Sequence, residues 1–194
     1  LVLLASTALL GIAIGSPAAA QDGREWDLAK ARAMQSHDMA VHQSIDRWRQ
    51  LVASDSFDFG SYSSFLLTYP GYPQADKIRA SAERALVNQS PDANSVVAFF
   101  SRYPPLSNQA AGRYAVALTT LRRPDAQQRA LAAWRGGSLA PNDEALILAT
   151  YRGALATADH DARMDRLLWQ SETSQAERQI SFVSAERRPL FMER

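Results

Sequence analysis

One short phrase occurs twice in the chain, and this repetition limits the architecture more than any other feature. Phe-Leu-Leu-Thr-Tyr-Pro covers residues 65–70 and Phe-Phe-Ser-Arg-Tyr-Pro covers residues 99–104, so that Tyr69 and Tyr103 are 34 positions apart. A period of about 34 residues is typical of helix-turn-helix repeats. One such pair cannot bury its own apolar face, whereas stacked pairs can. The spacing therefore predicts an α-solenoid, in which each tyrosine ends a first helix and packs against the second.

The rest of the sequence agrees with helices separated by Pro, Gly, Asp and Asn. Runs of alternating β-branched residues and Asn-Gly turns, the usual signals of strands and hairpins, are missing from the sequence. We therefore predict an all-α fold of antiparallel helix pairs, a tetratricopeptide-like superhelix. Helices are expected at about 26–52, 59–69, 73–86, 92–103, 110–121, 124–135, 141–151, 159–168 and 173–183, and from Pro189 onwards.

The first twenty residues differ from the remainder because they carry no charge and consist mostly of Leu, Ala, Ile and Val. Gly15-Ser16-Pro17 follows the apolar stretch, and three alanines precede Gln21. This pattern indicates a secretory signal peptide over residues 1–20, with cleavage expected after Ala20. The alternative is a membrane anchor, but the apolar run to Ile14 is shorter than the roughly 20 residues that a span needs.

Charge and cysteine content narrow the classes of function. The 21 basic and 20 acidic residues give a net charge of +1, whereas a nucleic-acid binder should have a basic surplus. The absence of cysteine removes disulfides, thiolate catalysis and the lipid-bearing cysteine of a lipoprotein. We expect a periplasmic chain, residues 21–194, with no membrane span after signal cleavage and no nucleic-acid partner.

Four carboxylates are candidates for acid–base chemistry, because two at a suitable separation permit glycoside hydrolysis. They are Asp143, Glu144, Asp161 and Asp165. All four lie near predicted helix starts, where a favourable interaction with the helix dipole explains them without catalysis.

His160 is a candidate metal ligand because it lies between Asp159 and Asp161. A metal site needs three or four converging ligands, and the other histidines, His37 and His42, are far away in sequence. We expect His160 to help cap a helix or to pack in a turn, and Asp159 to cap the helix that follows. The sequence assigns no catalytic residue, metal or cofactor.

Basic and aromatic residues offer candidates for binding a glycan. Arg163 and Arg166 form either a basic edge for carboxylates or surface salt bridges, which we favour. Three tryptophans have apolar neighbours in the sequence: Trp48, Trp134 and Trp169. Their two interpretations are stacking on sugars and packing in the core, and we favour core packing. Trp26, in a charged helix, is the best candidate for an exposed aromatic.

Four stretches go beyond a generic solenoid: FLLTYPGYPQADKIRASAERAL, RYPPLSNQAAGRYAVAL, RALAAWRGGSLAPNDEALILATYRGAL and DHDARMDRLLWQSETSQAERQI. Together they resemble the N-terminal superhelical domain of the bacterial soluble lytic transglycosylases, of alphaproteobacterial type. The resemblance covers about Trp48–Arg194, and Asp159–Trp169 is its most specific part.

The resemblance implies a periplasmic protein that cleaves peptidoglycan glycan strands between N-acetylmuramic acid and N-acetylglucosamine, leaving 1,6-anhydromuramic ends. In that family one glutamate, in a Glu-Ser motif of a lysozyme-like domain, acts as general acid and then as base. A Gly-Leu-Met-Gln stretch follows it. No Glu of this chain precedes a Ser, and the nearest case is Glu172 before Thr173.

The departure from the family pattern decides what we expect of this chain. The lysozyme-like domain should be absent, the superhelix should be truncated at its C-terminus, and the chain should be inactive alone. Its expected role is to position glycan strands and to hold its own missing catalytic domain. The alternative is a periplasmic tetratricopeptide-like scaffold that binds protein partners, which the 34-residue spacing favours and the phrase at Asp159–Trp169 does not.

Overall fold

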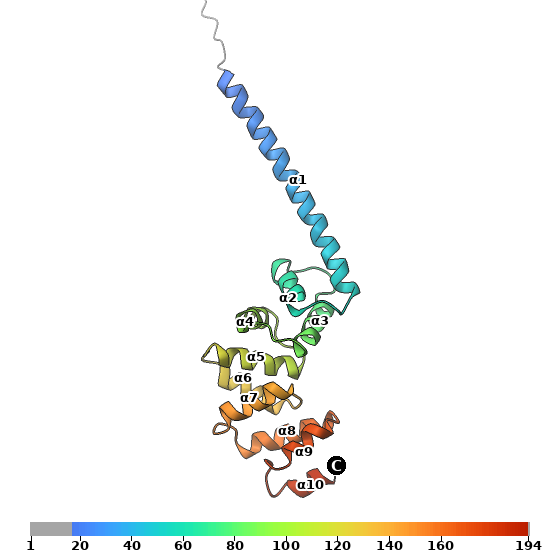
Figure 1. Ribbon diagram of the computed structural model, residues 1–194, viewed down its shortest axis with the longest axis vertical. Coiled ribbons are helices and arrows are strands. Elements are labelled where there is room, and N and C mark those ends of the chain that lie inside the picture. Colours follow the sequence, from blue (N-terminus) through green and yellow to red (C-terminus); the bar gives the residue numbers. More distant parts are fainter. Residues whose placement is uncertain (1–16, 194) are drawn as a thin grey trace, which may run out of the picture. The chain divides into compact units, whose positions relative to one another are not determined.

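The computed structural model describes the backbone of residues 17–193 and the side chains of residues 24–193. The predicted signal peptide lies outside this range except for the backbone of residues 17–20, the first turn of helix α1. Every regular element of the described part is a helix (Figure 1), which confirms the all-α prediction. None of these helices is both long and apolar enough to cross a bilayer. The chain divides into two compact units, Leu1–Arg47 and Trp48–Arg194.

The helices of the described residues follow the predicted order closely. Their bounds are α1 Pro17–Ala53, α2 Phe59–Thr68, α3 Ala75–Val87, α4 Ala93–Arg102, α5 Asn108–Thr120, α6 Ala126–Arg135, α7 Pro141–Tyr151, α8 Thr157–Trp169, α9 Thr173–Gln179 and α10 Arg188–Met192. Helix α9 is shorter than predicted. The Phe182 N–H donates to the Gln179 carbonyl in a tight turn, so Val183 is buried outside the helix.

Short polar side chains fix where several helices begin. The Asp58 carboxylate accepts the Ser61 N–H at 2.6 Å, and the Ser107 hydroxyl accepts the Ala110 N–H at 3.2 Å. Asp92 accepts two backbone N–H groups in the same way. Each bond satisfies a donor that the first turn of a helix leaves without an intrahelical partner.

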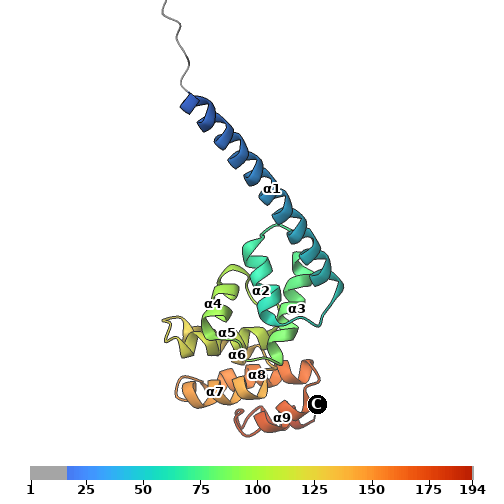
Figure 2. The same ribbon diagram turned by 45° about the horizontal axis from the view of Figure 1, so that its top comes forward.

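Helices of the Trp48–Arg194 unit stack as a solenoid does. Neighbours in sequence pair, such as α2 with α3, α4 with α5 and α8 with α9, and next-but-one helices also pack, such as α2 with α4 and α6 with α8 (Figures 1 and 2). The buried apolar residues accordingly form three successive clusters rather than one. They centre on Phe59 and Phe99, on Trp134, and on Leu167. The predicted solenoid of helix pairs is thereby confirmed.

The two copies of the repeated phrase have the same local structure. Tyr69 is the C-cap of α2 and Tyr103 is the C-cap of α4, each with a φ of −124°. Their N–H groups donate to Phe65 and Phe99 at 2.8 and 2.9 Å, and their rings lie 5.2 and 5.4 Å from those of the same phenylalanines. Tyr103 makes one contact that the repeated phrase did not predict. Its hydroxyl donates to the Leu66 carbonyl of α2 at 2.9 Å, so it ties its helix back to the preceding pair.

This difference between the two tyrosines predicts different effects of removing a hydroxyl. Tyr103→Phe should lower the free energy of unfolding by about 1 kcal/mol, because it removes the inter-repeat hydrogen bond. Tyr69→Phe is the matched control, since the Tyr69 hydroxyl makes no hydrogen bond with any described residue. Urea unfolding followed by circular dichroism measures both values. Equal losses in the two variants would contradict the assigned role of Tyr103.

The last turn of α6 lacks a hydrogen bond that the last turn of α8 has, and side chains of other helices replace it. At the end of α8, Ser171 adopts a φ of 58° and the next N–H, of Glu172, donates to the Leu167 carbonyl at 2.9 Å, as in a Schellman motif. At the end of α6, Gly137 takes the left-handed position with a φ of 101°, but the corresponding bond from Ser138 to Ala133 is replaced.

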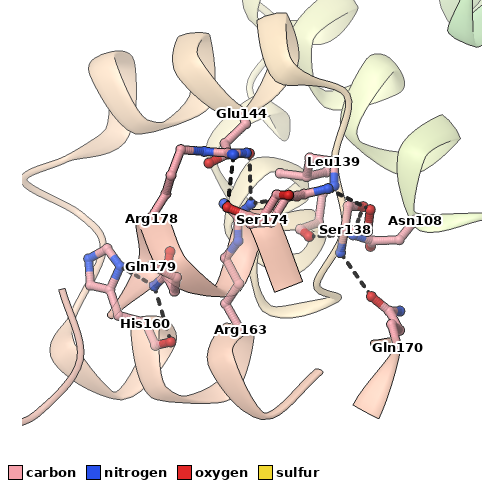
Figure 3. A network of polar contacts seen from close by, with 12 residues as sticks. Asn108, Ser138, Leu139, Glu144, His160, Arg163, Gln170, Ser174, Arg178 and Gln179 are labelled. Carbon is pink, nitrogen blue, oxygen red and sulfur yellow. Dashed lines mark hydrogen bonds and ion pairs between the residues drawn. The ribbon is translucent and has the colours of Figure 1, made fainter. Parts of the chain in front are cut away.

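Two side-chain amides provide partners for the two backbone groups that this bond would have joined. The Ser138 N–H donates to Oε1 of Gln170 at 3.0 Å, and the Ala133 carbonyl accepts from Nδ2 of Asn108 at 2.9 Å. Gln170 follows α8 and Asn108 begins α5, so the last turn of α6 is held by the helices on either side (Figure 3). A side chain at Gly137 would also meet the Arg166 Cβ at 2.9 Å, which adds a packing reason for glycine there.

Candidate functional site

The most buried charged group of the described chain is the guanidinium of Arg163 in α8. Arg163 is 0% exposed, and its Nη2 lies 3.2 Å from Oε2 of Glu144 in α7. The same carboxylate oxygen lies 3.1 Å from Nη2 of Arg178 in α9 (Figure 3). The guanidinium also stacks over the Trp134 ring, with its central carbon 3.9 Å from the ring centre. The expectation of a surface salt bridge was therefore wrong for Arg163, because α6, α7 and α9 enclose it.

Gln175 extends this polar cluster to the loop after α6. Its Oε1 accepts from the Leu139 N–H and from Nη2 of Arg163, both at 3.2 Å, and its Nε2 donates to the Ser138 hydroxyl at 2.8 Å. Burial lowers the pKa of Arg163, and the charge of Glu144 acts in the opposite direction. Nε and Nη1 of Arg163 have no hydrogen-bond partner among the described residues. The Arg163 guanidinium is fully buried and the cluster joins α7, α8 and α9, so its role is to hold these three helices together.

His160 is part of the same packing layer. Its ring stacks on Phe182 at 5.3 Å and meets the edge of Trp134 at 5.6 Å. Gln179 lies 3.1 Å from Nδ1 of His160 and donates to its backbone carbonyl at 3.2 Å. Burial lowers the pKa of His160, partly offset by Asp159. The described residues contain no group of three or more His, Cys, Asp or Glu arranged to hold a metal ion.

The carboxylates occupy less uniform positions than the sequence predicted. Asp143 and Glu144 lie in the first turn of α7, as expected, and each also pairs with an arginine. Burial raises the pKa of Asp143, while Arg113, at 3.0 Å, opposes the shift. The expectation that both Asp161 and Asp165 lie near a helix start was wrong for Asp165, which lies in the second half of α8, Thr157–Trp169, whereas Asp161 follows directly after its first turn.

Asp161 and Asp165 join α8 to the segment that leads into α10. The Asp161 carboxylate accepts the Ser184 N–H at 2.9 Å, and Asp165 pairs with Arg187 at 2.8 Å. Asp159 does cap α8, but from inside the helix. Its carboxylate accepts the N–H of Ala156, the N-cap residue, at 2.9 Å and pairs with Arg135.

The tryptophans separate into buried and exposed groups. Trp134 is 1% exposed, in agreement with core packing. Trp48 is half-buried and donates its indole N–H to the Pro73 carbonyl at 2.9 Å. Trp26 is 71% exposed in α1. The core-packing prediction was wrong for Trp169, which is 78% exposed at the end of α8.

Trp169 borders a hollow of about 380 Å³ on the surface of α6 and α8. Its lining residues are Arg135, Ala162, Asp165, Arg166 and Trp169. Arg166 is exposed there and has no ion pair with any described residue. The hollow thus presents an aromatic face, one unpaired cation and a second arginine that is held by Asp159. We call this surface the Trp169 hollow.

Sequence reasoning missed this grouping although the signal was present. Ala162, Asp165, Arg166 and Trp169 follow one another at i, i+3, i+4 and i+7, which places them on one face of a helix. Arg135 comes from α6 and has no such signal, because its place beside them depends on how α6 packs on α8.

A second and larger depression lies between α8, α9 and α10. Its volume is about 500 Å³, and it is lined mainly by apolar side chains with Glu172 and Glu177 among them. We call it the α8–α10 groove.

Comparison of the chain with models of protein families, with curated proteins and with solved structures found no match.

Proposed function

We propose that this chain is the non-catalytic, superhelical part of a periplasmic lytic transglycosylase, and that it positions peptidoglycan glycan strands for cleavage. The family resemblance of Trp48–Arg194 motivates the proposal, and the solenoid fold is compatible with it. The Trp169 hollow is the observation that supports a contact with glycan most directly.

The chemistry of the hollow suits a strand of amino sugars that bear acidic substituents. An exposed indole offers an apolar face on which the C–H face of a sugar ring can stack. Arg166 offers a cation with five N–H donors, and carboxylates of the lactyl and peptide groups are its natural partners. Arg135 is already paired with Asp159, so Arg166 carries the charge complementarity in this proposal.

Removal of the indole should weaken binding to peptidoglycan. We expect Trp169→Ala to raise the dissociation constant for purified sacculi about tenfold, which corresponds to about 1.4 kcal/mol, while Trp169→Phe keeps most of the affinity. Co-sedimentation with sacculi measures the bound fraction. Leu106→Ala is the matched control, because Leu106 is also a large exposed apolar residue but lies between α4 and α5.

Incubation of the chain with the same sacculi, followed by mass spectrometry of the released material, tests the catalytic part of the proposal. We expect no anhydromuropeptides, because no Glu-Ser pair is present in the chain. Their release would mean that a catalytic group lies among these helices. Binding that is insensitive to Trp169→Ala would remove the hollow from the proposal.

The second candidate is a scaffold that binds protein partners. The α8–α10 groove favours it, because apolar grooves of this kind take amphipathic helices. The sacculus experiment separates the two candidates, since a chain that neither binds sacculi nor releases products would favour the scaffold.

A further inference from the structure

The α8–α10 groove has an acidic, apolar surface without a partner in the described chain. Its apolar lining includes Leu168, Ile180 and Phe191. Glu172 and Glu177 line it as well, no Lys, Arg or His does, and neither glutamate forms an ion pair with a described residue. A ligand for this surface should therefore combine large apolar side chains with positive charge.

Helix α1 carries a face with the opposite character. Trp26, Lys30, Met34, His37 and Val41 are all exposed. At 3.6 residues per turn they fall within an arc of about 80°, along about 22 Å of helix. Lys30 and His37 are the ionisable groups of this arc.

The acidic residues of the same stretch lie elsewhere on α1. Glu25, Asp27 and Asp38 all fall outside the arc when the helix is drawn at 100° per residue. The face is therefore apolar with basic interruptions, which we call the Trp26 face. All side chains described from residue 24 to residue 43 are exposed, so no described residue covers this face.

We propose that the α8–α10 groove of one copy of this chain binds the Trp26 face of α1 from a second copy. Large apolar side chains at intervals of about two helical turns are the usual anchors of a helix in a groove. Lys30 then faces the glutamates of the groove, so charge complementarity sets which face of α1 enters. The occupant is already present in every copy, and neither surface is covered by a described residue of the chain that carries it.

Such a contact joins different surfaces and is therefore heterologous. An open assembly of any length therefore has an unoccupied groove at one end and an unoccupied Trp26 face at the other. Association should increase with concentration and should weaken with salt, because Lys30 and the glutamates are at the surface. Parallel pairing of two α1 helices through their Trp26 faces is disfavoured, since it sets Lys30 against Lys30 of the second copy.

Sedimentation velocity of the purified chain over a concentration series tests the proposal. We expect the average mass to rise from monomer to dimer and beyond. Trp26→Asp and Leu168→Glu should each shift this rise to at least tenfold higher concentration. Leu106→Glu is the matched control, since it adds the same charge at an exposed leucine far from the groove. Circular dichroism verifies that each variant is folded.

A mixture of the two disrupted variants makes the test specific. Trp26→Asp keeps an intact groove and Leu168→Glu keeps an intact Trp26 face, so an equimolar mixture should form a dimer that grows no further. Lys30→Glu should weaken association, and Glu172→Lys with Glu177→Lys in the second copy should restore it.

Three results would overturn the proposal. One is a monomer at every concentration. Another is association that Leu168→Glu leaves unchanged, which would indicate pairing of α1 with α1. The last is a mixture of the two disrupted variants that forms no dimer.

Discussion

Replacement of Glu144 by alanine should lower the free energy of unfolding by about 3–5 kcal/mol, the cost of leaving a buried charge without its partner. The Arg163 guanidinium would stay enclosed between Trp134 and α9, with only Gln175 to accept a hydrogen bond. Arg178 would lose the same carboxylate, but it is half-exposed and can turn to water. Urea denaturation monitored by circular dichroism gives the value.

Two further variants separate the buried pair from a general effect of charge. Glu177→Ala, the matched control, removes an exposed carboxylate of the neighbouring helix and should change stability by less than about 0.5 kcal/mol. Glu144→Leu combined with Arg163→Met should recover most of the loss, because an apolar pair replaces an ion pair that had to be desolvated. A loss below about 1 kcal/mol in Glu144→Ala would mean that water reaches Arg163.

Phe99→Ala should cost about 3–5 kcal/mol, in the range of large-to-small changes at buried aromatic residues. Phe99 is 1% exposed, and its ring meets those of Phe59, Phe100 and Tyr103 at 5.2–5.4 Å. It therefore lies at the junction between the first two helix pairs, and the cavity left by its removal would weaken both.

The expected signature of Phe99→Ala is a lower denaturation midpoint with an unchanged slope, as for a loss of stability without a change in the surface exposed on unfolding. Leu106→Ala is the matched control, since it removes a large apolar side chain that is exposed. A loss as small as that of the control would show that the helix pairs at this junction do not depend on each other.

The helices were predictable because the residues that start and end each helix lie within it or next to it in the sequence. Proline and aspartate mark the starts at Asp92 and Pro141, and the Tyr-Pro phrase marks the ends of α2 and α4. The period of 34 residues was enough to predict stacking, because a helix pair with an apolar face must cover it with a neighbour. The signals that start and end helices involve only a few residues, and the repeat is visible as a recurring phrase, so both can be recognised from the sequence alone.

The fate of single polar side chains was not predictable in the same way. Arg163 and Arg166 are three positions apart on one helix, yet the first is enclosed and the second is exposed. Which of them is buried depends on Trp134 and Glu144, residues of other helices whose approach no local pattern records. Trp169 was mispredicted for a related reason, because its apolar character was weighed without the polar residues that share its face.

The borrowed closure of α6 has a consequence for how the solenoid comes apart. Asn108 of α5 and Gln170 at the end of α8 complete the hydrogen bonds of the α6 terminus, so this helix cannot fray at that end while its neighbours stay in place. Opening any one of the three exposes polar groups of another, and the penalty for local unfolding is shared. In hydrogen exchange, α5, α6 and α8 should therefore behave as one cooperative block. The solenoid would thus unfold in groups of helices of unequal size, and the largest group would be the three helices that the amide side chains of Asn108 and Gln170 connect.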